Sequence, residues 1–429
     1  VKPLPEGLSF AGHAHEDGTV EFLADLTWVD QAGNRYTDHQ IFERQLAMIG
    51  QAERLIVADL FLFNEFAGDA QGRGLKPLAD QLTEALIARK QQRPDLQIAF
   101  ISDPINTLYG GVASPHLSDL RNAGIEVVVT RLDRLRDSNP LWSATWRLCC
   151  RWFGNSQGGG WLPNPVGEEK VTLRTWLQLA NFKANHRKTL FVDQGDQWTA
   201  LVTSANPHDA SSAHGNTGLV FTGSSAVDLL STERAIAGFS GGDHAAWPQP
   251  SAQQSTNSSG LTTRVLTEAA IRDAVIDGLE ETGPGSQIDL AMFYLSHRGI
   301  VRALARARRR GAEVRLLLDP NEHAFGRRKN GIPNRPVAAE LKQHGIEVRW
   351  CHTTGEQCHS KQLLIRYRNG TARLISGSAN YTRRNLDDFN LETVLEVTGP
   401  SQAELMQSAA GWFEARWLNE NGRSFSLDY

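Results

Sequence analysis

Two stretches of the chain show the same succession of amphipathic and apolar segments. Residues 41–63 and residues 266–295 each place apolar positions at helical spacing before a continuous apolar run, which predicts a helix followed by a buried strand. A further apolar run ends at Asp103 in the first stretch and at Asp319 in the second. Helix-to-strand segments that share the tripeptide Gly-Ile-Glu follow at residues 117–131 and 338–352. Alternating helices and strands of this kind are typical of α/β folds.

The last pair of corresponding segments carries a His-x-Lys tripeptide at the start of an apolar strand. The positions of His186 and His359 differ by 173 (359 − 186), and those of Asn206 and Asn380 differ by 174 (380 − 206). This near-constant offset indicates an internal duplication. The sequence therefore predicts an α/β protein of two similar sandwich halves with mixed β-sheets flanked by helices, and we expect a pseudo-twofold axis to relate the halves.

A stretch rich in Gly, Pro, Ser, Gln and Asn lies between the two copies and shows no apolar periodicity, which predicts a linker. The predicted division is an N-terminal half at residues 1–243, a linker at residues 244–263 and a C-terminal half at residues 264–429. Each half is expected to be unable to form the site alone.

The first copy carries an insert before its histidine. The interval from Gly124 to His186 is 62 (186 − 124), whereas the interval from Gly345 to His359 is only 14 (359 − 345). The first copy is therefore longer by about 48 (62 − 14), and the extra segment lies at about residues 132–182. The insert holds five of the 11 tryptophans, which are Trp142, Trp146, Trp152, Trp161 and Trp176.

Helical spacing gives this insert two interpretations. Trp142, Trp146 and Phe153 fall on one face of a helix predicted over residues 141–153. In one interpretation the helix packs on the domain. In the other it lies in a membrane interface, with Trp142, Trp146, Phe153 and Trp161 facing the lipid and arginines facing phosphates.

Each His-x-Lys tripeptide presents imidazole and ammonium on one side of a strand, because residues i and i+2 share a face. The pairs are His186 with Lys188 and His359 with Lys361. A serine and an asparagine follow at the end of the next predicted strand, as Ser204 and Asn206 in the first copy and Ser378 and Asn380 in the second. Two halves facing each other would present two histidines and two lysines to one site.

That set of groups suits a phosphodiester. Lysine, serine and asparagine donors can hold the non-bridging oxygens and stabilise the charge that builds during transfer. One imidazole can attack phosphorus while the opposite one protonates the leaving oxygen. Because the lysines supply the positive charge, we expect no metal ion and no other cofactor.

The duplicated motif closely resembles the phospholipase D superfamily, whose signature is HxKxxxxD followed by G/S-x-x-N. The first copy is complete and has Asp193 as its acidic residue, whereas Arg366 stands at that position in the second copy. The resemblance covers nearly the whole chain. It implies two α/β halves with one shared site, a covalent phosphohistidine intermediate and no metal. Asp193 is a candidate for the catalytic set, and its alternative is a salt bridge or turn carboxylate.

The resemblance also implies roles for individual residues. His186 is expected to be the nucleophile and His359 the acid and then the base, with Lys188 and Lys361 in the catalytic set. The phosphate-binding residues implied by the motif are Ser204, Asn206, Ser378 and Asn380.

An acidic residue often lies about thirty positions beyond each catalytic histidine in this family and orients its ring. Glu392 fits this position for His359 (392 − 359 = 33). The corresponding residues 216–218 of the first copy contain no carboxylate. The sequence therefore names no partner for the ring of His186.

The segments 204–216 and 376–392 look like those of bacterial membrane-associated members, the cardiolipin synthases and related phosphatidyltransferases. The function implied is hydrolysis of glycerophospholipids or phosphatidyl transfer of the cardiolipin-synthase type. The expected partners are a phospholipid substrate at a membrane surface and an alcohol or lipid acceptor, with no obligate protein partner. A metal-independent nuclease of the same superfamily is one alternative, and a non-enzymatic membrane-binding scaffold, suggested by Arg366, is another.

Composition limits these classes further. The net charge of −4 excludes a polycation that coats nucleic acid, and four cysteines exclude a disulfide scaffold. No run of eighteen apolar residues is present, so no spanning segment is expected. The chain begins at Val1 rather than Met, from which we expect N-terminal residues to be missing, with room for an anchor. The expected location is a bacterial membrane, held peripherally or by such an anchor.

Overall fold

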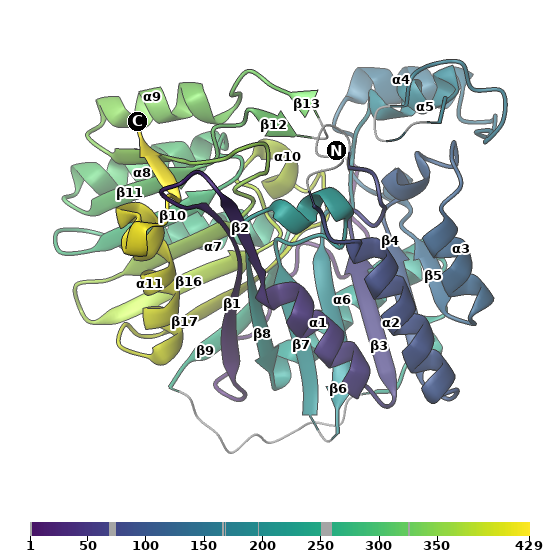
Figure 1. The fold of residues 1–429 in the computed structure, drawn as a ribbon, viewed down its shortest axis with the longest axis horizontal. Helices are drawn as coiled ribbons and strands as arrows, with labels where there is room; N and C mark the ends of the chain where they lie inside the picture. The colour runs from purple at the N-terminus through teal and green to yellow at the C-terminus, as the bar shows by residue number, and fades with distance from the viewer. Residues whose placement is uncertain are drawn as a thin grey trace.

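The computed structural model describes residues 2–67, 74–164, 167, 169–195, 197–249, 260–324 and 327–429. Two mixed sheets of eight strands each form the body of the protein, and helices flank both sheets (Figure 1). The predicted architecture of two similar α/β halves is confirmed.

The first sheet has the strand order β2-β1-β8-β7-β6-β3-β4-β5. Its strands are β1 (Val20–Val29), β2 (Arg35–His39), β3 (Leu55–Leu60), β4 (Gln97–Ser102), β5 (Glu126–Val129), β6 (Lys188–Gln194), β7 (Gln197–Thr203) and β8 (Asn216–Thr222). The helices of this half are α1 (Gln40–Gln51), α2 (Leu78–Gln92), α3 (Pro115–Asn122), α4 (Pro140–Cys149), α5 (Leu173–Leu179) and α6 (Ser224–Ser240).

The second sheet has the strand order β18-β14-β11-β10-β15-β16-β17-β9. Its strands are β9 (Thr262–Thr267), β10 (Gln287–Met292), β11 (Glu313–Leu318), β14 (Glu347–Cys351), β15 (Lys361–Arg366), β16 (Thr371–Gly377), β17 (Thr393–Pro400) and β18 (Ser426–Asp428). The helices are α7 (Ala269–Glu280), α8 (Arg298–Arg309), α9 (Asn334–Gln343), α10 (Arg383–Leu386) and α11 (Glu404–Leu418), and a short hairpin joins β12 (His323–Ala324) to β13 (Arg327–Arg328).

Seven strands of each sheet correspond in order. The series β1-β8-β7-β6-β3-β4-β5 of the first half matches β9-β17-β16-β15-β10-β11-β14 of the second, and β2 and β18 extend opposite edges. The central strands β3 and β6 are buried almost throughout, because helices and the other half cover both faces of the sheet. This is why they read as continuous apolar runs rather than alternating ones.

A shared hydrophobic core joins the two halves. Val202 and Phe221 of the first sheet belong to the same buried cluster as Leu374 and Val397 of the second. Helices α6 and α11 contribute to it from opposite halves, and the N-terminal residues 11–15 pair with β9 of the second half. The halves therefore fold against each other as one body.

The predicted division at residues 244–263 stays a prediction. Residues 250–259 of that linker lie outside the described residues, and β9 already begins at Thr262. Cys351 and Cys358 form a disulfide beside the second histidine motif, and Cys149 and Cys150 form another within the insert. Within the described part of the chain, no helix is long and apolar enough to cross a bilayer.

The insert contains two short helices, and its tryptophans differ from the prediction. Helix α4 ends at Cys149, so Phe153 does not continue its face. The Nε1–H of Trp142 donates to the carbonyl of Leu177 at 2.8 Å, and Arg174 lies 4.5 Å over the ring of Trp146. The expectation that Trp142 and Trp146 face lipid is therefore wrong, because both rings are half-buried against α5 and residues beside it. Phe153 and Trp161 are exposed.

Candidate active site

The two motif histidines are each held by the backbone of the opposite half. The N–H of His186 donates to the carbonyl of Leu391 at 2.9 Å, and the N–H of His359 donates to the carbonyl of Gly215 at 2.8 Å. Leu391 and Gly215 occupy the same position in their halves, immediately before Glu392 and Asn216. The site is thus built by exchange of backbone hydrogen bonds between the two halves.

Carboxylates at the ends of two parallel strands fix the residue before each histidine. Asp103 accepts from the N–H of Asn185 at 2.6 Å, and Asp319 accepts from the N–H of Cys358 at 2.7 Å. Burial raises the pKa of both carboxyls to about 7. These two residues end corresponding apolar runs in the sequence, and that shared position is the signal by which their role could have been found.

Each motif lysine lies directly behind its histidine. The Nζ of Lys188 donates to the carbonyl of His186 at 2.6 Å, and the Nζ of Lys361 donates to the carbonyl of His359 at 2.7 Å. Both lysines are almost completely buried. Burial lowers the pKa of Lys188 to about 7. Burial, together with the positive charge of Lys188, lowers the pKa of Lys361 well below its ordinary value.

A phenylalanine lies against each histidine, and the sequence analysis missed both. The ring of Phe61 is 4.8 Å from that of His186, and the ring of Phe293 is 4.9 Å from that of His359. Each phenylalanine directly follows a corresponding strand, β3 or β10, so the duplication contained the signal for this pair as well. The edge-on contacts restrict the rotation of both imidazoles.

The partners of the imidazole Nδ1 atoms are crossed between the halves. The Nδ1 of His186 lies 2.8 and 3.0 Å from the two carboxylate oxygens of Glu392, and the Nδ1 of His359 lies 3.1 Å from the Oδ1 of Asn216. The expectation that Glu392 orients His359 is therefore wrong. Glu392 orients His186, because the halves pack with β17 of one beside the motif of the other.

The motif serines support these partners. Ser378 donates to the carboxylate of Glu392, and Ser204 donates to Oδ1 of Asn216 at 3.0 Å. Both serines are fully buried and neither lines the cavity beside the histidines. The prediction that Ser204 and Ser378 bind the substrate phosphate is wrong, since their hydroxyls are used to hold Glu392 and Asn216.

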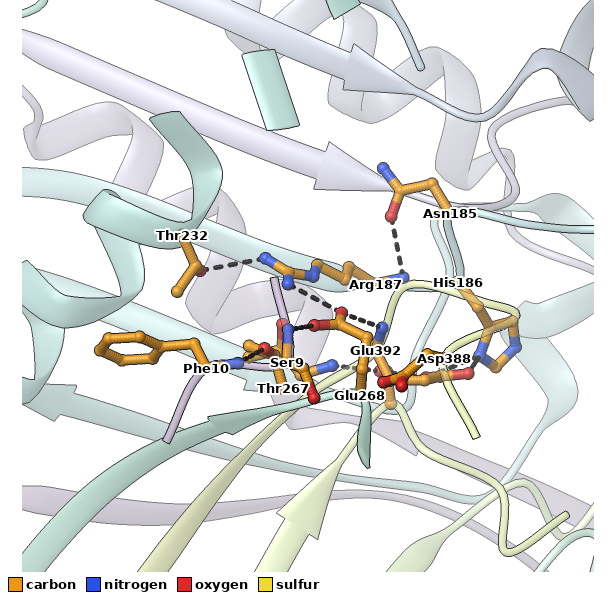
Figure 2. A network of polar contacts seen from close by, with 12 residues as sticks. Ser9, Phe10, Asn185, His186, Arg187, Thr232, Thr267, Glu268, Asp388 and Glu392 are labelled. Atoms are coloured by element: carbon orange, nitrogen blue, oxygen red, sulfur yellow. Dashed lines mark hydrogen bonds and ion pairs between the residues drawn. The ribbon is translucent and has the colours of Figure 1, made fainter. Parts of the chain in front are cut away.

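A buried ionic network continues behind Glu392 (Figure 2). The guanidinium of Arg187 donates to Oε1 of Glu268 at 2.9 Å, and the same oxygen accepts from the N–H of Glu392 at 3.0 Å. The other oxygen of Glu268 accepts from the N–H of Ser9 at 2.7 Å. Arg187 also lies 3.5 Å from Glu233. The network ties the first motif, the N-terminal segment and the second half to the position of Glu392.

Burial sets the protonation of the two histidines. Burial, together with the positive charges of Lys188 and Lys361, holds the pKa of His186 well below 6.5, and burial and Lys361 do the same for His359. Burial also raises the pKa of Glu392 to about 8, although Lys188 acts against this rise. In the free protein both imidazoles are therefore neutral, and the Nε2 of His186 has a lone pair available for attack.

A cavity of about 770 Å³ opens over the histidines. His186, His359, Asn206 and Asn380 all line it, as expected from the motif. Asn206 accepts from the N–H of Leu62 through its Oδ1, which leaves its NH₂ group to donate, and the Oδ1 of buried Asn380 has no hydrogen-bond partner within the described structure. Four of the predicted site residues thus meet at one cavity.

The remaining walls of the cavity combine apolar and basic side chains. Apolar residues that line it include Phe61, Leu62, Phe66, Ile332 and Phe389, and basic ones include Arg35, Lys329, Arg383 and Arg384. Ser138 and Phe182, near the two ends of the insert, also line the wall. Among the described residues, no group of three or more His, Cys, Asp or Glu side chains is arranged to hold a metal ion.

Asp193 lies away from this cavity. It is the fifth residue after Lys188 along β6, about 16 Å further at the usual rise of a strand. Its Oδ1 accepts the backbone N–H groups of Glu53, Arg54 and Leu55 at 2.8–3.1 Å. Of the two interpretations of Asp193, these contacts favour the turn carboxylate, because its side chain fastens the turn before β3.

Arg366, the residue that replaces the motif aspartate in the second copy, is equally remote. Its guanidinium donates to Asp289 at 2.8 Å, and Asp289 also accepts from Arg315 at 2.8 Å. Arg366 does not line the cavity. The departure from the motif thus changes a local ion pair and leaves the groups around the histidines unaltered.

Asp193→Ala is expected to lower the free energy of unfolding by about 3 kcal/mol, because three backbone N–H groups lose their acceptor. The folded fraction is expected to keep its kcat within about twofold, given the distance from the cavity. Urea denaturation and steady-state kinetics on the same preparation measure the two effects. Asp193→Asn, which keeps one acceptor oxygen, is the control. A large loss of kcat at unchanged stability would contradict this assignment.

Comparison with known proteins gives one family match and several likenesses of fold. Residues 275–417 match the family described as cardiolipin synthase, PLD-like domain, and no curated protein sequence matches the chain. A phosphatidylserine synthase from Haemophilus influenzae Rd KW20 is 10% identical, with a TM-score of 0.57 over 97% of this chain and 89% of that one. A polyphosphate kinase from Porphyromonas gingivalis is 14% identical, with a TM-score of 0.50 over 96% of this chain and 48% of that one.

These two likenesses concern the fold, and the chain spans about half the length of the polyphosphate kinase. The family match lies in the second half, where it covers the motif of His359 and Lys361. The first half repeats both the strand order and the motif. The family match thus covers residues 275–417, and the fold shared with the phosphatidylserine synthase extends over 97% of this chain.

Proposed function

We propose that this protein is a phosphodiesterase or phosphatidyltransferase that acts on glycerophospholipids, by hydrolysis or by transfer of the cardiolipin-synthase type, through a phosphohistidine on His186. The observation that carries the proposal is the unequal support of the two histidines. His186 has an ionisable carboxyl group on Nδ1, whereas His359 has an amide that stays neutral.

This inequality suits a division of labour. When the Nε2 of His186 attacks phosphorus, positive charge develops on its ring. This charge favours the ionised form of the adjacent Glu392, whose carboxylate then stabilises the ring. An anionic phosphodiester in the cavity favours the imidazolium form of His359, whose Nε2 proton passes to the leaving oxygen as the bond from phosphorus to that oxygen breaks. His359 then takes a proton from water or an alcohol, which attacks the phosphohistidine and restores His186.

The other groups around the cavity supply binding. Asn206 and Asn380 offer amides at the cavity surface. Lys188 and Lys361 do not line the cavity, and their contribution is positive charge directly behind the two imidazoles. Aromatic and aliphatic side chains beside Arg383 and Arg384 fit a ligand with both an anionic headgroup and an apolar body. This mixture favours a lipid over nucleic acid, which would require aromatic side chains along a continuous basic groove.

Incubation with phosphatidylglycerol and, separately, with single-stranded DNA tests the proposal. Mass spectrometry of the lipid products, with and without added glycerol, is expected to show phosphatidic acid or an exchanged phosphatidyl alcohol, and the DNA is expected to stay intact. Cleavage of DNA alone would replace the proposed function by a nuclease. Absence of turnover of either substrate by protein with intact His186 would remove the enzymatic proposal.

The kcat/KM for phospholipid is expected to fall as the pH rises above about 7. The Lys188 ammonium has a lowered pKa of about 7, so in the free enzyme its charge is present below this pH and is lost above it. The alkaline limb of kcat itself is expected at higher pH, because bound phosphate stabilises the ammonium form. Initial rates across the pH range at low and at saturating substrate measure both profiles. A kcat/KM that stays level to alkaline pH would show that the lysine charge is not required.

A further inference from the structure

The insert between β5 and β6 carries most of the exposed apolar surface near the cavity. Six large hydrophobic residues of the described insert are exposed by half or more, namely Leu141, Leu148, Trp152, Phe153, Trp161 and Leu173. In the rest of the described chain only two large hydrophobic residues, Ile332 and Leu418, are exposed to this extent. Because folded domains normally cover such a concentration, this surface is expected to contact another phase or molecule.

These side chains project from a supported scaffold. The amide of Asn155 donates to Thr175 at 2.9 Å and lies within hydrogen-bonding distance of the carbonyls of Leu108 and Tyr109. The Nε1–H of Trp176 donates to the carbonyl of Pro163 at 3.0 Å. Tryptophans 142 and 176 thus anchor the insert from within, and Trp152 and Trp161, at 69% and 67% exposure, do not share in that packing.

The charge of this surface complements an anionic bilayer. The insert at residues 132–182 contains six basic and four acidic residues, a net charge of +2 (6 − 4), although the whole chain has a net charge of −4. Arg147 forms an ion pair with Asp137. Exposed Arg151 lies 4.1 Å over the ring of Trp152, which places a cation beside an aromatic ring. Tryptophan with adjacent arginine is the combination that suits the headgroup region of a membrane.

The insert is also connected to the mouth of the cavity. Arg136, near its start, forms an ion pair with Asp388, and Phe182, at its end, lies 5.4 Å from the guanidinium of Arg384. Figure 1 shows α4 and α5 at the same end of the molecule as α10 and the β12–β13 hairpin, which contribute to the cavity wall. Because Ser138 and Phe182 of the insert line the cavity, a surface touching the insert would lie beside the active site.

We propose that the insert docks on the surface of an anionic phospholipid bilayer, with Leu148, Trp152 and Phe153 entering the headgroup region and Arg151 facing lipid phosphates. The purpose of docking, which is to present lipid to the cavity, rests on the proposed function. Docking itself requires no turnover. This surface differs from the lipid-facing set predicted from helical spacing. Trp142 and Trp146 of that set are half-buried, whereas Leu148 and Trp152 are exposed.

Co-sedimentation with vesicles of phosphatidylcholine, with and without phosphatidylglycerol, tests the docking. The full chain is expected to bind the phosphatidylglycerol vesicles more tightly, and added salt is expected to weaken this binding. The double variant Trp152→Ser, Phe153→Ser is expected to lose affinity on the order of a hundredfold, because two large side chains no longer leave water. The vesicle affinity of Leu148→Ser is compared with that of Leu418→Ser. The second variant carries the same substitution at an exposed leucine of α11 and is the control, which is expected to leave vesicle affinity unchanged.

Two further measurements separate membrane docking from catalysis and from self-association. The His186→Ala protein is expected to bind vesicles as the unchanged protein does, and the double variant is expected to keep its rate on a short-chain phospholipid dissolved as monomers. Equal vesicle affinity of the double variant and the unchanged protein would overturn the proposal. A concentration-dependent dimer abolished by the double variant, without vesicle binding, would overturn it in favour of an interface between copies. Binding without turnover of any phospholipid would instead refute the proposed function alone.

Discussion

His186→Ala is expected to lower kcat for phospholipid turnover by at least about 10⁴-fold, because the variant lacks the proposed nucleophile. Thermal unfolding of the variant is expected to change little, since the ring is at the cavity wall and its backbone bond to Leu391 remains. The control is His359→Ala, which removes the opposite imidazole and leaves the nucleophile.

A substrate with p-nitrophenol as leaving group distinguishes the two histidines. This leaving group needs no proton, so His359→Ala is expected to release about one equivalent rapidly and then to stop, because the base for the second step is missing. The phosphorylated residue, located by peptide mass spectrometry, is expected to be His186. A burst from His186→Ala, with the label on His359, would reverse the assigned roles.

Glu392→Gln is expected to reduce kcat by about 10³-fold, because a neutral amide cannot stabilise the charge that develops on His186. The size of the side chain is kept, and the hydrogen bond that Ser378 donates can still be accepted by the amide oxygen. Steady-state kinetics, together with thermal unfolding to confirm folding, provide the measurement. The KM is expected to move less than kcat, since Glu392 does not line the cavity.

Asn216→Asp is the matched variant for this prediction. It gives His359 a carboxylate in place of its neutral partner, and is expected to raise the pKa of His359 and shift the pH profile without removing the intermediate. If Glu392→Gln left kcat unchanged while Asn216→Asp abolished it, the carboxylate on Nδ1 would not mark the nucleophile.

The duplication made most of the fold and the centre of the site predictable. A constant offset between two motifs identified His186, His359 and their lysines, and it also implied the paired sheets. It did not identify Phe61 and Phe293, or Asp103 and Asp319, although each pair occupies corresponding positions. The signal was present, but the chemistry of these residues is not visible without their neighbours.

Asp193 could have been placed correctly from strand geometry alone. Side chains alternate along a strand, so the rule that puts His186 and Lys188 on one face puts Asp193 on the other. Its backbone partners are at residues 53–55, about 140 positions earlier, and sequence gives no indication of them. The motif marks a set of residues needed by the fold as a whole, of which only some approach the substrate.

The partner of His186 was missed because the contact crosses between halves. Glu392 is much closer along the chain to His359 than to His186, but its carboxyl group contacts His186. The tryptophans of the insert were misplaced for a related reason. Helical spacing shows which residues share a face, but only the position of α5 shows that Trp142 is turned inward to Leu177.

The crossed partners also have a consequence during synthesis of the chain. His186 leaves the ribosome 206 residues before Glu392, an interval of about 10 to 40 s at usual rates of elongation. Throughout that interval His186 has neither the carboxyl group of Glu392 nor the backbone acceptor of Leu391. A chain interrupted between the two motifs therefore lacks both contacts, and any reactivity of His186 that depends on them is delayed until the second motif has emerged.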